Sequence, residues 1–316
     1  MKKILICGAT GFIGRNVAEY FSDKESYEVF GTYFKSMPYN NSKINFLEAD
    51  LTKKEDVNRI IKGKDIIIQA AAYCTGSKDI IDRPYVHTTE NVIMNTLIFR
   101  EAFEQGVSHV IFPSCTTMYG SSDIPVKEDS FSHEKIPEKY LACGKMKVYL
   151  EDMCKLFSNF GETKFTAMRH SNLYGPYDRF DLEKSHVFGA TITKVMQAKE
   201  GNKINVWGTG EEERDLLYVL DMVDFISKAI DKQQTPYELV NVGLGKSISV
   251  SDLVKKIIDI SGKNLGIEYD STKPTIKTKL ALDCSKAKEN FGWEPQVSLE
   301  EGIQKTIYWY KENIKS

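Results

Sequence analysis

The chain has 316 residues, of which 41% are hydrophobic and 27% charged, and its formal net charge is −2. This length and composition are typical of a folded protein with a large core and exclude an intrinsically disordered chain. The balanced charge gives no electrostatic basis for binding nucleic acid or an anionic membrane. No signal-peptide pattern and no apolar stretch of about 18 residues is present, which predicts a cytoplasmic protein.

Six cysteines are scattered along the chain, at Cys7, Cys74, Cys115, Cys143, Cys154 and Cys284. Their separations match neither a disulfide framework nor the ligand spacing of a zinc site. We therefore expect reduced thiols and no metal centre.

A strand, a glycine turn and a helix open the chain. The apolar run 4–7 leads into Gly8, Gly11 and Gly14, and a helical pattern follows over about 14–22. Gly8 permits a tight turn, Gly11 lets backbone N–H groups approach a diphosphate, and Gly14 lets the helix pack on the strand. The pattern predicts a dinucleotide site at the N-terminus of the helix, and an ordinary strand-to-helix turn is the alternative.

Strands and helices then alternate as far as residue 169. Strands are predicted at about 28–34, 44–48, 65–69, 108–113 and 164–169, and helices at about 53–62, 88–105 and 138–159. Connections of helical length imply parallel strand pairing, and short apolar runs suit strands covered on both faces. The predicted fold class is α/β, a Rossmann-type doubly wound parallel sheet.

A second, smaller lobe is predicted from about residue 171, where loops rich in Gly, Pro, Asp and Lys become longer. Further helices are predicted near 187–199, 221–231, 249–261 and 299–312. We expect a cofactor-binding Rossmann domain over 1–170, to which segments near 216–244 return. A smaller α/β lobe over 171–316 is expected to hold the substrate.

The end of the second strand bears on the choice between NAD(H) and NADP(H). NAD-binding proteins carry a carboxylate there for the ribose hydroxyls, whereas this strand runs through Tyr33 to Lys35 without one. Arg15 and Lys35 are candidates for a 2′-phosphate, which favours NADP(H), unless both are solvated surface cations. The other expected cofactor contacts are Gly8, Thr10, Gly11, Phe12, Ile13, Gly14, Tyr33, Asp50, Leu51, Ala70, Ala71 and Ala72.

Several motifs along the chain carry a family resemblance, at 112–120, 172–187, 206–210, 214–219, 241–243, 273–274 and 291–293. They resemble the extended short-chain dehydrogenase/reductase family and, more specifically, its GDP-L-fucose synthase branch. The resemblance spans essentially the whole chain. It implies reduction of a 4-keto GDP-sugar by hydride from NADPH, in the synthesis of surface-polysaccharide sugars.

The resemblance also implies a catalytic set from which this chain departs. In the family a Tyr protonates the keto oxygen, a Ser or Thr donates a hydrogen bond to it, and a Lys binds the nicotinamide ribose. Lys147 matches the lysine, which places Cys143 at the Tyr position and Cys115 at the Ser or Thr position. A thiol with a pKa of about 8.5 is acidic enough beside tyrosine at about 10, but its sulfur lies closer to the backbone than a phenolic oxygen does.

Three explanations of Cys143 are open. It is an inactivating substitution that traps a complex, or a natural variant that relays the proton through water, or Tyr140 one turn earlier supplies the acid. Alternatively, both Cys115 and Cys143 are small buried core residues.

The epimerase pair of the family is half present. The resemblance implies a His base at His186, but the acid, a Cys in the family, is Thr117, a poor proton donor to carbon. We therefore expect a reductase without epimerisation, with Thr116 beside Thr117 in the catalytic segment. A GDP-sugar 4-dehydrogenase, a bifunctional 3,5-epimerase/4-reductase and a catalytically silent protein that binds cofactor and nucleotide-sugar are the alternatives.

The resemblance further implies a substrate pocket and a homodimer. The candidate substrate residues are Asn172, His186, Val187, Lys194, Trp207, Arg214 and Lys279. Helices of the family that correspond to 88–105 and 138–159 form a dimer interface. Here they carry additional apolar residues, namely Val92, Ile93, Leu97, Phe103, Met146, Tyr149, Met153 and Leu156.

Overall fold

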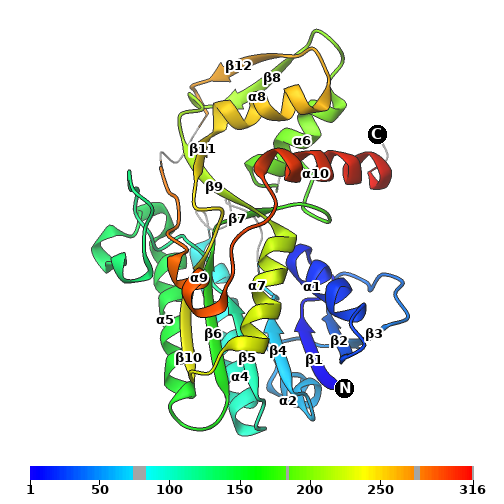
Figure 1. Ribbon diagram of the computed structural model, residues 1–316, viewed down its shortest axis with the longest axis vertical. Coiled ribbons are helices and arrows are strands. Elements are labelled where there is room, and N and C mark those ends of the chain that lie inside the picture. The colour runs from blue at the N-terminus through cyan, green and yellow to red at the C-terminus, as the bar shows by residue number, and fades with distance from the viewer. Residues whose placement is uncertain (74–82, 183–184, 274–277, 315–316) are drawn as a thin grey trace.

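The computed structural model describes residues 1–73, 83–182, 185–273 and 278–314. Figure 1 shows a large domain built around one sheet, with a smaller lobe packed against one end of it. Cys74 lies outside the described residues, as do Glu183, Lys184 and Pro274 of the family motifs. The other five cysteines are free thiols.

Seven parallel strands form the central sheet, in the order β10-β6-β5-β4-β1-β2-β3. They are β1 (Lys2–Cys7), β2 (Tyr27–Tyr33), β3 (Ile44–Glu48), β4 (Ile66–Gln69), β5 (His109–Pro113), β6 (Lys164–His170) and β10 (Tyr237–Val242). The order reverses between β1 and β4, as in a doubly wound sheet, which confirms the predicted fold class.

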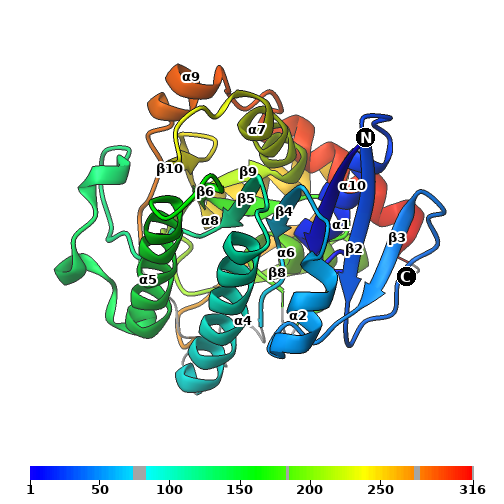
Figure 2. The same ribbon diagram turned by 90° about the horizontal axis from the view of Figure 1, so that it is seen from below.

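Helices cover both faces of this sheet, as Figure 2 shows from below. One face holds α1 (Phe12–Ser22), α7 (Val219–Lys232) and α9 (Ser285–Phe291), and the other holds α2 (Lys54–Ile61), α4 (Pro84–Glu104) and α5 (Leu141–Ser158). Side chains of β1 point alternately to the two faces of the sheet. Ile4 and Ile6 pack in the core under the first set of helices, and Leu5 and Cys7 pack in the core under the second.

Among its described residues, the smaller lobe contains two short sheets and three helices. Its elements are β7 (Asn172–Tyr174), α6 (Val187–Gln197), β8 (Lys203–Trp207), β9 (Glu213–Tyr218), β11 (Ser247–Ser249), α8 (Val250–Ser261), β12 (Gly266–Asp270) and α10 (Leu299–Asn313). Strands β11, β9 and β7 form one sheet, and β12 pairs with β8 in the other. The helices were predicted, whereas these strands were not, although β8, β9 and β12 are at least as long as the predicted strands β3 and β5.

Two predicted helices differ at their starts. Helix α4 begins at Pro84 instead of about 88, since a proline in the first turn is pre-organised for a helix. The predicted helix 138–159 opens as a 3₁₀ turn, Glu138–Tyr140, before α5. Two more 3₁₀ turns, Glu128–Ser130 and His133–Lys135, precede it.

The predicted dimer surface needs one correction. Met146 is only 3% exposed and packs in the core between α4, α5 and the sheet, because its side chain faces the strands. Ile93, Tyr149 and Leu156 are 38%, 47% and 44% exposed. Within the described ranges, no helix is both long enough and apolar enough to span a membrane.

Candidate functional site

The glycine turn between β1 and α1 is built for close packing at two positions and for access at the third. A Cβ on Gly8, whose φ is +74°, would lie 2.7 Å from the Cα of Ala71, and one on Gly14 would lie 2.1 Å from the carbonyl oxygen of Gly8. A Cβ on Gly11 would meet its nearest neighbour at 3.4 Å. Gly11 is exposed, and it therefore leaves an open approach to the helix terminus.

The N-terminus of α1 has the chemistry of an anion site. Gly11 is the N-cap residue, and no side chain in the described ranges caps the first turn. The N–H groups of Phe12 and Ile13 therefore lack partners within the helix and carry the positive end of its dipole. The residues of the predicted turn thus fit the diphosphate of a dinucleotide.

Thr32 of β2 holds this turn in place, and sequence reasoning missed it. Its hydroxyl accepts a hydrogen bond from Gly8 N at 2.8 Å, and its carbonyl accepts one from Ala9 N at 2.9 Å. Because Thr32 lies 24 residues from Gly8 in the chain, no local sequence pattern identifies it. Asn16 of α1 donates to the carbonyl of Pro176 at 2.9 Å, which ties the turn to the smaller lobe.

Arg15 and Lys35, the candidates for the 2′-phosphate, occupy different environments. The Arg15 guanidinium lies between the rings of Tyr39 and Tyr177, at 4.0 and 3.8 Å from their centroids, and pairs with Glu19 at 2.9 Å. Lys35 is exposed, with its ammonium 5.5 Å from the Tyr73 ring centroid. Lys35 is therefore the better placed of the two to meet an added phosphate.

The remaining cofactor candidates lie at the carboxyl ends of the strands. Tyr33 ends β2, and Asp50 accepts hydrogen bonds from the N–H and hydroxyl of Thr52 at 3.1 and 2.7 Å. Leu51 is 8% exposed, so its side chain belongs to the core. Thr10 lies in the glycine turn, and the segment Ala70, Ala71 and Ala72 follows β4, with Ala71 against Gly8.

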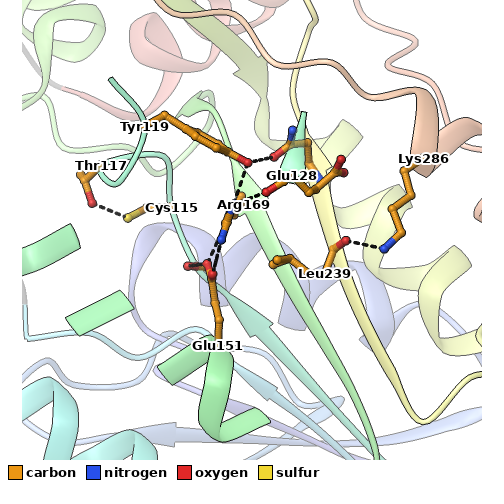
Figure 3. Close-up of polar contacts among 10 residues, drawn as sticks. Cys115, Thr117, Tyr119, Glu128, Glu151, Arg169, Leu239 and Lys286 are labelled. Atoms are coloured by element: carbon orange, nitrogen blue, oxygen red, sulfur yellow. Dashed lines mark hydrogen bonds and ion pairs between the residues drawn. The ribbon is translucent and has the colours of Figure 1, made fainter. Parts of the chain in front are cut away.

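Three predicted catalytic residues come together beyond β5. The hydroxyl oxygen of Thr117 lies 3.0 Å from the sulfur of Cys115 and 3.7 Å from the sulfur of Cys143, and Figure 3 shows the first of these contacts. Cys143 is 5% exposed and Cys115 is partly exposed. Thr116 is partly exposed beside them.

The pKa values of the two thiols are shifted in opposite directions. A hydrogen bond from the Cys143 thiol, against the opposing effect of burial, lowers the pKa of Cys115 to about 6, and the charge of Lys147 adds to the effect. The same interaction and burial hold the pKa of Cys143 far above its ordinary value. Of the two, Cys115 is therefore the sulfur that more readily becomes a thiolate, and Cys143 is the one that keeps its proton.

Lys147 lies one helical turn after Cys143 on α5. Its ammonium donates to the carbonyl of Pro113 at 3.3 Å and lies 4.8 Å from the ring centroid of Phe112. These contacts hold the charge at the carboxyl end of β5, beside the two sulfurs.

Tyr140, which closes the 3₁₀ turn before α5, lies within electrostatic range of this cluster. Burial raises the pKa of its phenol, the charge of Arg214 lowers it, and Cys143 and Cys115 raise it. The phenol is therefore a protonated group that senses both sulfurs and an arginine from the smaller lobe.

A family model for the NAD dependent epimerase/dehydratase family matches residues 4–243. The chain belongs to this family. This confirms the resemblance on which the catalytic residues were assigned. Membership in the epimerase/dehydratase family also agrees with the open glycine turn, since the family is described as NAD dependent.

Individual relatives cover nearly the whole chain. GDP-L-colitose synthase of Yersinia pseudotuberculosis is 28% identical over 98% of this chain and 97% of its own length. A probable GDP-L-fucose synthase 1 of Oryza sativa subsp. japonica is 30% identical over 99% of this chain and 93% of its own. The crystal structure of Thermotoga maritima UDP-glucose 4-epimerase with UDP-glucose has a TM-score of 0.87 at 26% identity, covering 99% of this chain and 100% of that one.

The substrate candidates of this family member are spread over the smaller lobe. Arg214 donates to the carbonyls of Glu213 and Thr278 at 2.9 and 3.0 Å, and to the hydroxyl of Thr278. Lys279 pairs with Asp123 and Glu213, each at 3.4 Å. Of the candidates, Arg214 is the one whose charge reaches Tyr140 and hence the sulfur cluster.

Other substrate candidates lie farther along the lobe. Asn172 donates its side-chain amide to the carbonyl of Asp215 at 3.2 Å, and Lys194 donates to the carbonyl of Asn205 at 2.8 Å. Trp207 is 53% exposed at the end of β8. Val187 begins α6, and His186 is its exposed N-cap residue.

His170, at the end of β6, is a site residue that the sequence reasoning missed. It donates from Nδ1 to the carbonyl of Ser171 at 2.8 Å. Burial, together with the charges of Lys147 and His186, lowers its pKa to about 4. It is therefore a neutral acceptor close to Lys147, and its place at the carboxyl end of a central strand was the available signal.

A buried polar network stands behind the cluster (Figure 3). Arg169 forms a bidentate pair with Glu151, and it also donates to the Tyr119 hydroxyl at 2.9 Å. Tyr119 donates to Asn241 at 2.9 Å, and Ser114 donates to Glu151 at 2.6 Å. Ser114 and Tyr119 flank Cys115 and Thr117, so the network holds both ends of the segment 114–119.

Proposed function

We propose that this protein is an NADP(H)-dependent reductase of a 4-keto GDP-sugar, acting in the cytoplasm in the synthesis of surface-polysaccharide sugars. The observation that carries the proposal is the meeting of Cys115, Thr117 and Cys143 beside Lys147 at the carboxyl end of β5. The names of the colitose and fucose synthase relatives support GDP as the nucleotide.

Reduction of a keto group needs a hydride, a hydrogen-bond donor for the developing oxyanion and a proton. The bound nicotinamide cofactor supplies the hydride. The Thr117 hydroxyl, which lies beside both Cys115 and Cys143, is proposed as the hydrogen-bond donor to the keto oxygen. Lys147 stabilises negative charge in the cluster and is placed to hold the nicotinamide ribose.

Tyr140 is proposed as the proton donor. Burial keeps its phenol protonated, and Arg214 stabilises the phenolate that remains after the proton leaves. Arg214 is also suited to the substrate diphosphate, since a guanidinium binds phosphate in a bidentate manner. A substrate whose diphosphate binds Arg214 would therefore have its keto group near Tyr140, the proposed proton donor.

His186 is proposed to hydrogen-bond the sugar and not to epimerise it. Its expected partner acid is Thr117, whose hydroxyl proton is held far too tightly to be given to carbon at neutral pH. The protein is therefore expected to accept a substrate whose stereochemistry has been set beforehand.

One experiment tests this function against its alternatives. Protein and NADPH are mixed with a GDP-linked 4-keto sugar in deuterated water, and NADPH absorbance and deuterium on the sugar carbons are followed. NADPH oxidation without ring deuteration supports the reductase. Deuteration at the carbons beside the keto group indicates a 3,5-epimerase/4-reductase, and neither change, with nucleotide still bound, indicates a silent binding protein.

Two controls separate the remaining possibilities. GDP-sugar alcohol with NADP+ tests for a 4-dehydrogenase, and UDP-glucose tests for the activity named in the Thermotoga maritima structure. Conversion of UDP-glucose without net NADPH consumption would contradict the proposal.

We also propose a homodimer formed through α4 and α5. The exposed apolar side chains Ile93, Tyr149 and Leu156 lie on these two helices, which pack against each other. Burial of such side chains in a partner is favourable. Light scattering that finds only the 35.9 kDa chain would contradict this assembly.

A further inference from the structure

Two thiols occupy the catalytic cluster, and they come from elements that are far apart in sequence. Cys115 follows β5, and Cys143 lies in the first turn of α5. Their sulfurs share one neighbour, the Thr117 hydroxyl oxygen, at 3.0 and 3.7 Å. Both cysteines lie close to an element end, where small backbone shifts cost less than in the middle of a helix or strand.

The two cysteines differ in exposure. Cys115 is partly exposed. Cys143 lines a cavity of about 260 Å³ together with His87, Thr88 and Leu141. The Nε2 atom of His87 and the hydroxyl of Thr88 are buried without a hydrogen-bond partner among the described residues, so this cavity has polar groups to offer a small polar molecule.

The electrostatics of the pair favour thiol chemistry at Cys115. The adjacent Cys143 thiol and the Lys147 ammonium stabilise a thiolate there, which agrees with the lowered pKa of Cys115. By contrast, burial raises the pKa of Cys7 to about 12 and that of Cys154 well above its usual value. These two buried thiols are inert internal controls.

We propose that Cys115 and Cys143 form a reversible thiol-modification site that takes low-molecular-weight disulfides and closes to an intramolecular disulfide. The Cys115 thiolate attacks one sulfur of the small disulfide, forming a mixed disulfide and releasing one thiolate, which takes up a proton. The Cys143 thiol then loses its proton and attacks the Cys115 sulfur, and the second small thiol leaves. The protein dithiol is oxidised by two electrons, and the small disulfide is reduced to two thiols.

Closure would change the cluster that the proposed function uses. The two sulfurs would approach to about 2.0 Å, with loss of the thiolate and of the hydrogen bonds at Thr117. Loss of reductase activity on oxidation rests on the proposed function, but the modification itself does not.

The test follows mass and not activity. The full chain, reduced and freed of reductant, is incubated with oxidised glutathione at pH 7, and intact mass and peptide cross-links are measured. We expect the loss of two hydrogen atoms, a cross-link between the peptides of Cys115 and Cys143, and recovery of the original mass with dithiothreitol.

Matched variants define each step. Cys143→Ser is expected to stop at one glutathione adduct on Cys115, and Cys115→Ser to take up no glutathione in the same time. Cys154→Ala, which removes an inert thiol, is expected to behave as the wild type. In the unaltered chain, the rate of alkylation of Cys115 by iodoacetamide is expected to rise with pH with a midpoint near the pKa of about 6.

Several results would overturn the proposal. They are an unchanged mass, a glutathione adduct that persists on the wild type without closure, a cross-link to another cysteine, or an alkylation midpoint near the ordinary thiol value. If the disulfide forms but no sugar reduction is detected, the modification site stands and the proposed function fails.

Discussion

Glu151 and Arg169 form an ion pair with its shortest contact at 2.6 Å, and each side chain is only 3% exposed. The pair lies directly behind the catalytic segment, because Ser114 donates to Glu151 and Arg169 donates to Tyr119. Burial without a partner would leave either charge poorly solvated. The pair therefore joins α5 to β6 and also holds the segment that carries Cys115 and Thr117.

Removing one partner of this ion pair is expected to destabilise the folded protein. Glu151→Ala should lower the free energy of unfolding by about 3–5 kcal/mol, because it leaves the Arg169 charge buried and unpaired. Urea unfolding measures the change. The matched control is Glu104→Ala in the exposed pair with Arg100, which should leave the unfolding midpoint unchanged. Equal effects of the two substitutions would contradict the interpretation.

Substitutions of two glycines in the turn between β1 and α1 should distinguish an effect on stability from an effect on cofactor binding. Gly14→Ala should destabilise the fold by about 1–3 kcal/mol, because the added methyl group meets a backbone carbonyl. Gly11→Ala should leave stability nearly unchanged yet weaken NADPH binding, since it narrows only the open approach. Thermal unfolding and fluorescence titration with NADPH measure the two properties. Unaltered affinity in a folded Gly11→Ala protein would argue against diphosphate binding at this turn.

Lys35 is expected to recognise the 2′-phosphate. Lys35→Ala should weaken NADPH binding about fivefold, as expected for one exposed charge contact worth about 1 kcal/mol, and leave NADH binding unaffected. Isothermal titration with both cofactors measures the ratio. Lys62→Ala, at the exposed end of α2, is the control. A parallel change for both cofactors, or tighter binding of NADH than NADPH by the wild type, would refute the assignment.

Substitutions can show whether the proton donor is Tyr140 or a side chain at position 143. Tyr140→Phe should lower kcat at least 100-fold, within the range of about 10²–10⁴ for a lost general acid, with little change in KM. Tyr308→Phe, at a tyrosine that is 68% exposed on α10, should have no effect. If instead Cys143→Tyr raises kcat and Tyr140→Phe does not lower it, the proton donor belongs at position 143.

Stability should fall in mild acid because of His109. Burial lowers its pKa in the folded protein to about 3, whereas an unfolded histidine titrates near about 6.5. Between these values the unfolded chain binds the extra proton, so the free energy of unfolding declines by up to about 1.4 kcal/mol per pH unit as pH falls. Urea unfolding from pH 7 to pH 5 measures the slope. His109→Gln should reduce it, whereas substitution of the exposed His133 should not.

The cofactor turn and six of the seven strands of the central sheet could be predicted because their signals are local, whereas β10 (Tyr237–Val242) was not predicted. A strand such as 66–68 has three consecutive isoleucines, all 1% exposed or less, and glycines sit where side chains would collide. The strands of the smaller lobe were missed because three-residue segments such as Ser247–Ser249 have no measurable periodicity. Met146 was placed on the surface because an apolar helix residue has the same appearance in sequence whether it faces the sheet or a partner.

By itself, the sequence determined the strand-turn-helix at Gly8, Gly11 and Gly14, the alternation that builds the sheet, and the thiols at two positions where the family has oxygen donors. Only the tertiary structure decided that Cys115 and Cys143 meet at one hydroxyl. It also decided that the segment 114–119 is held by a hydrogen-bonded network whose members come from separate parts of the chain. These members are Glu151, Arg169, Tyr119 and Asn241. The physical reason is that backbone conformation follows from neighbouring residues, whereas a pKa, an ion pair or a shared hydrogen bond depends on atoms that only folding brings within a few ångströms.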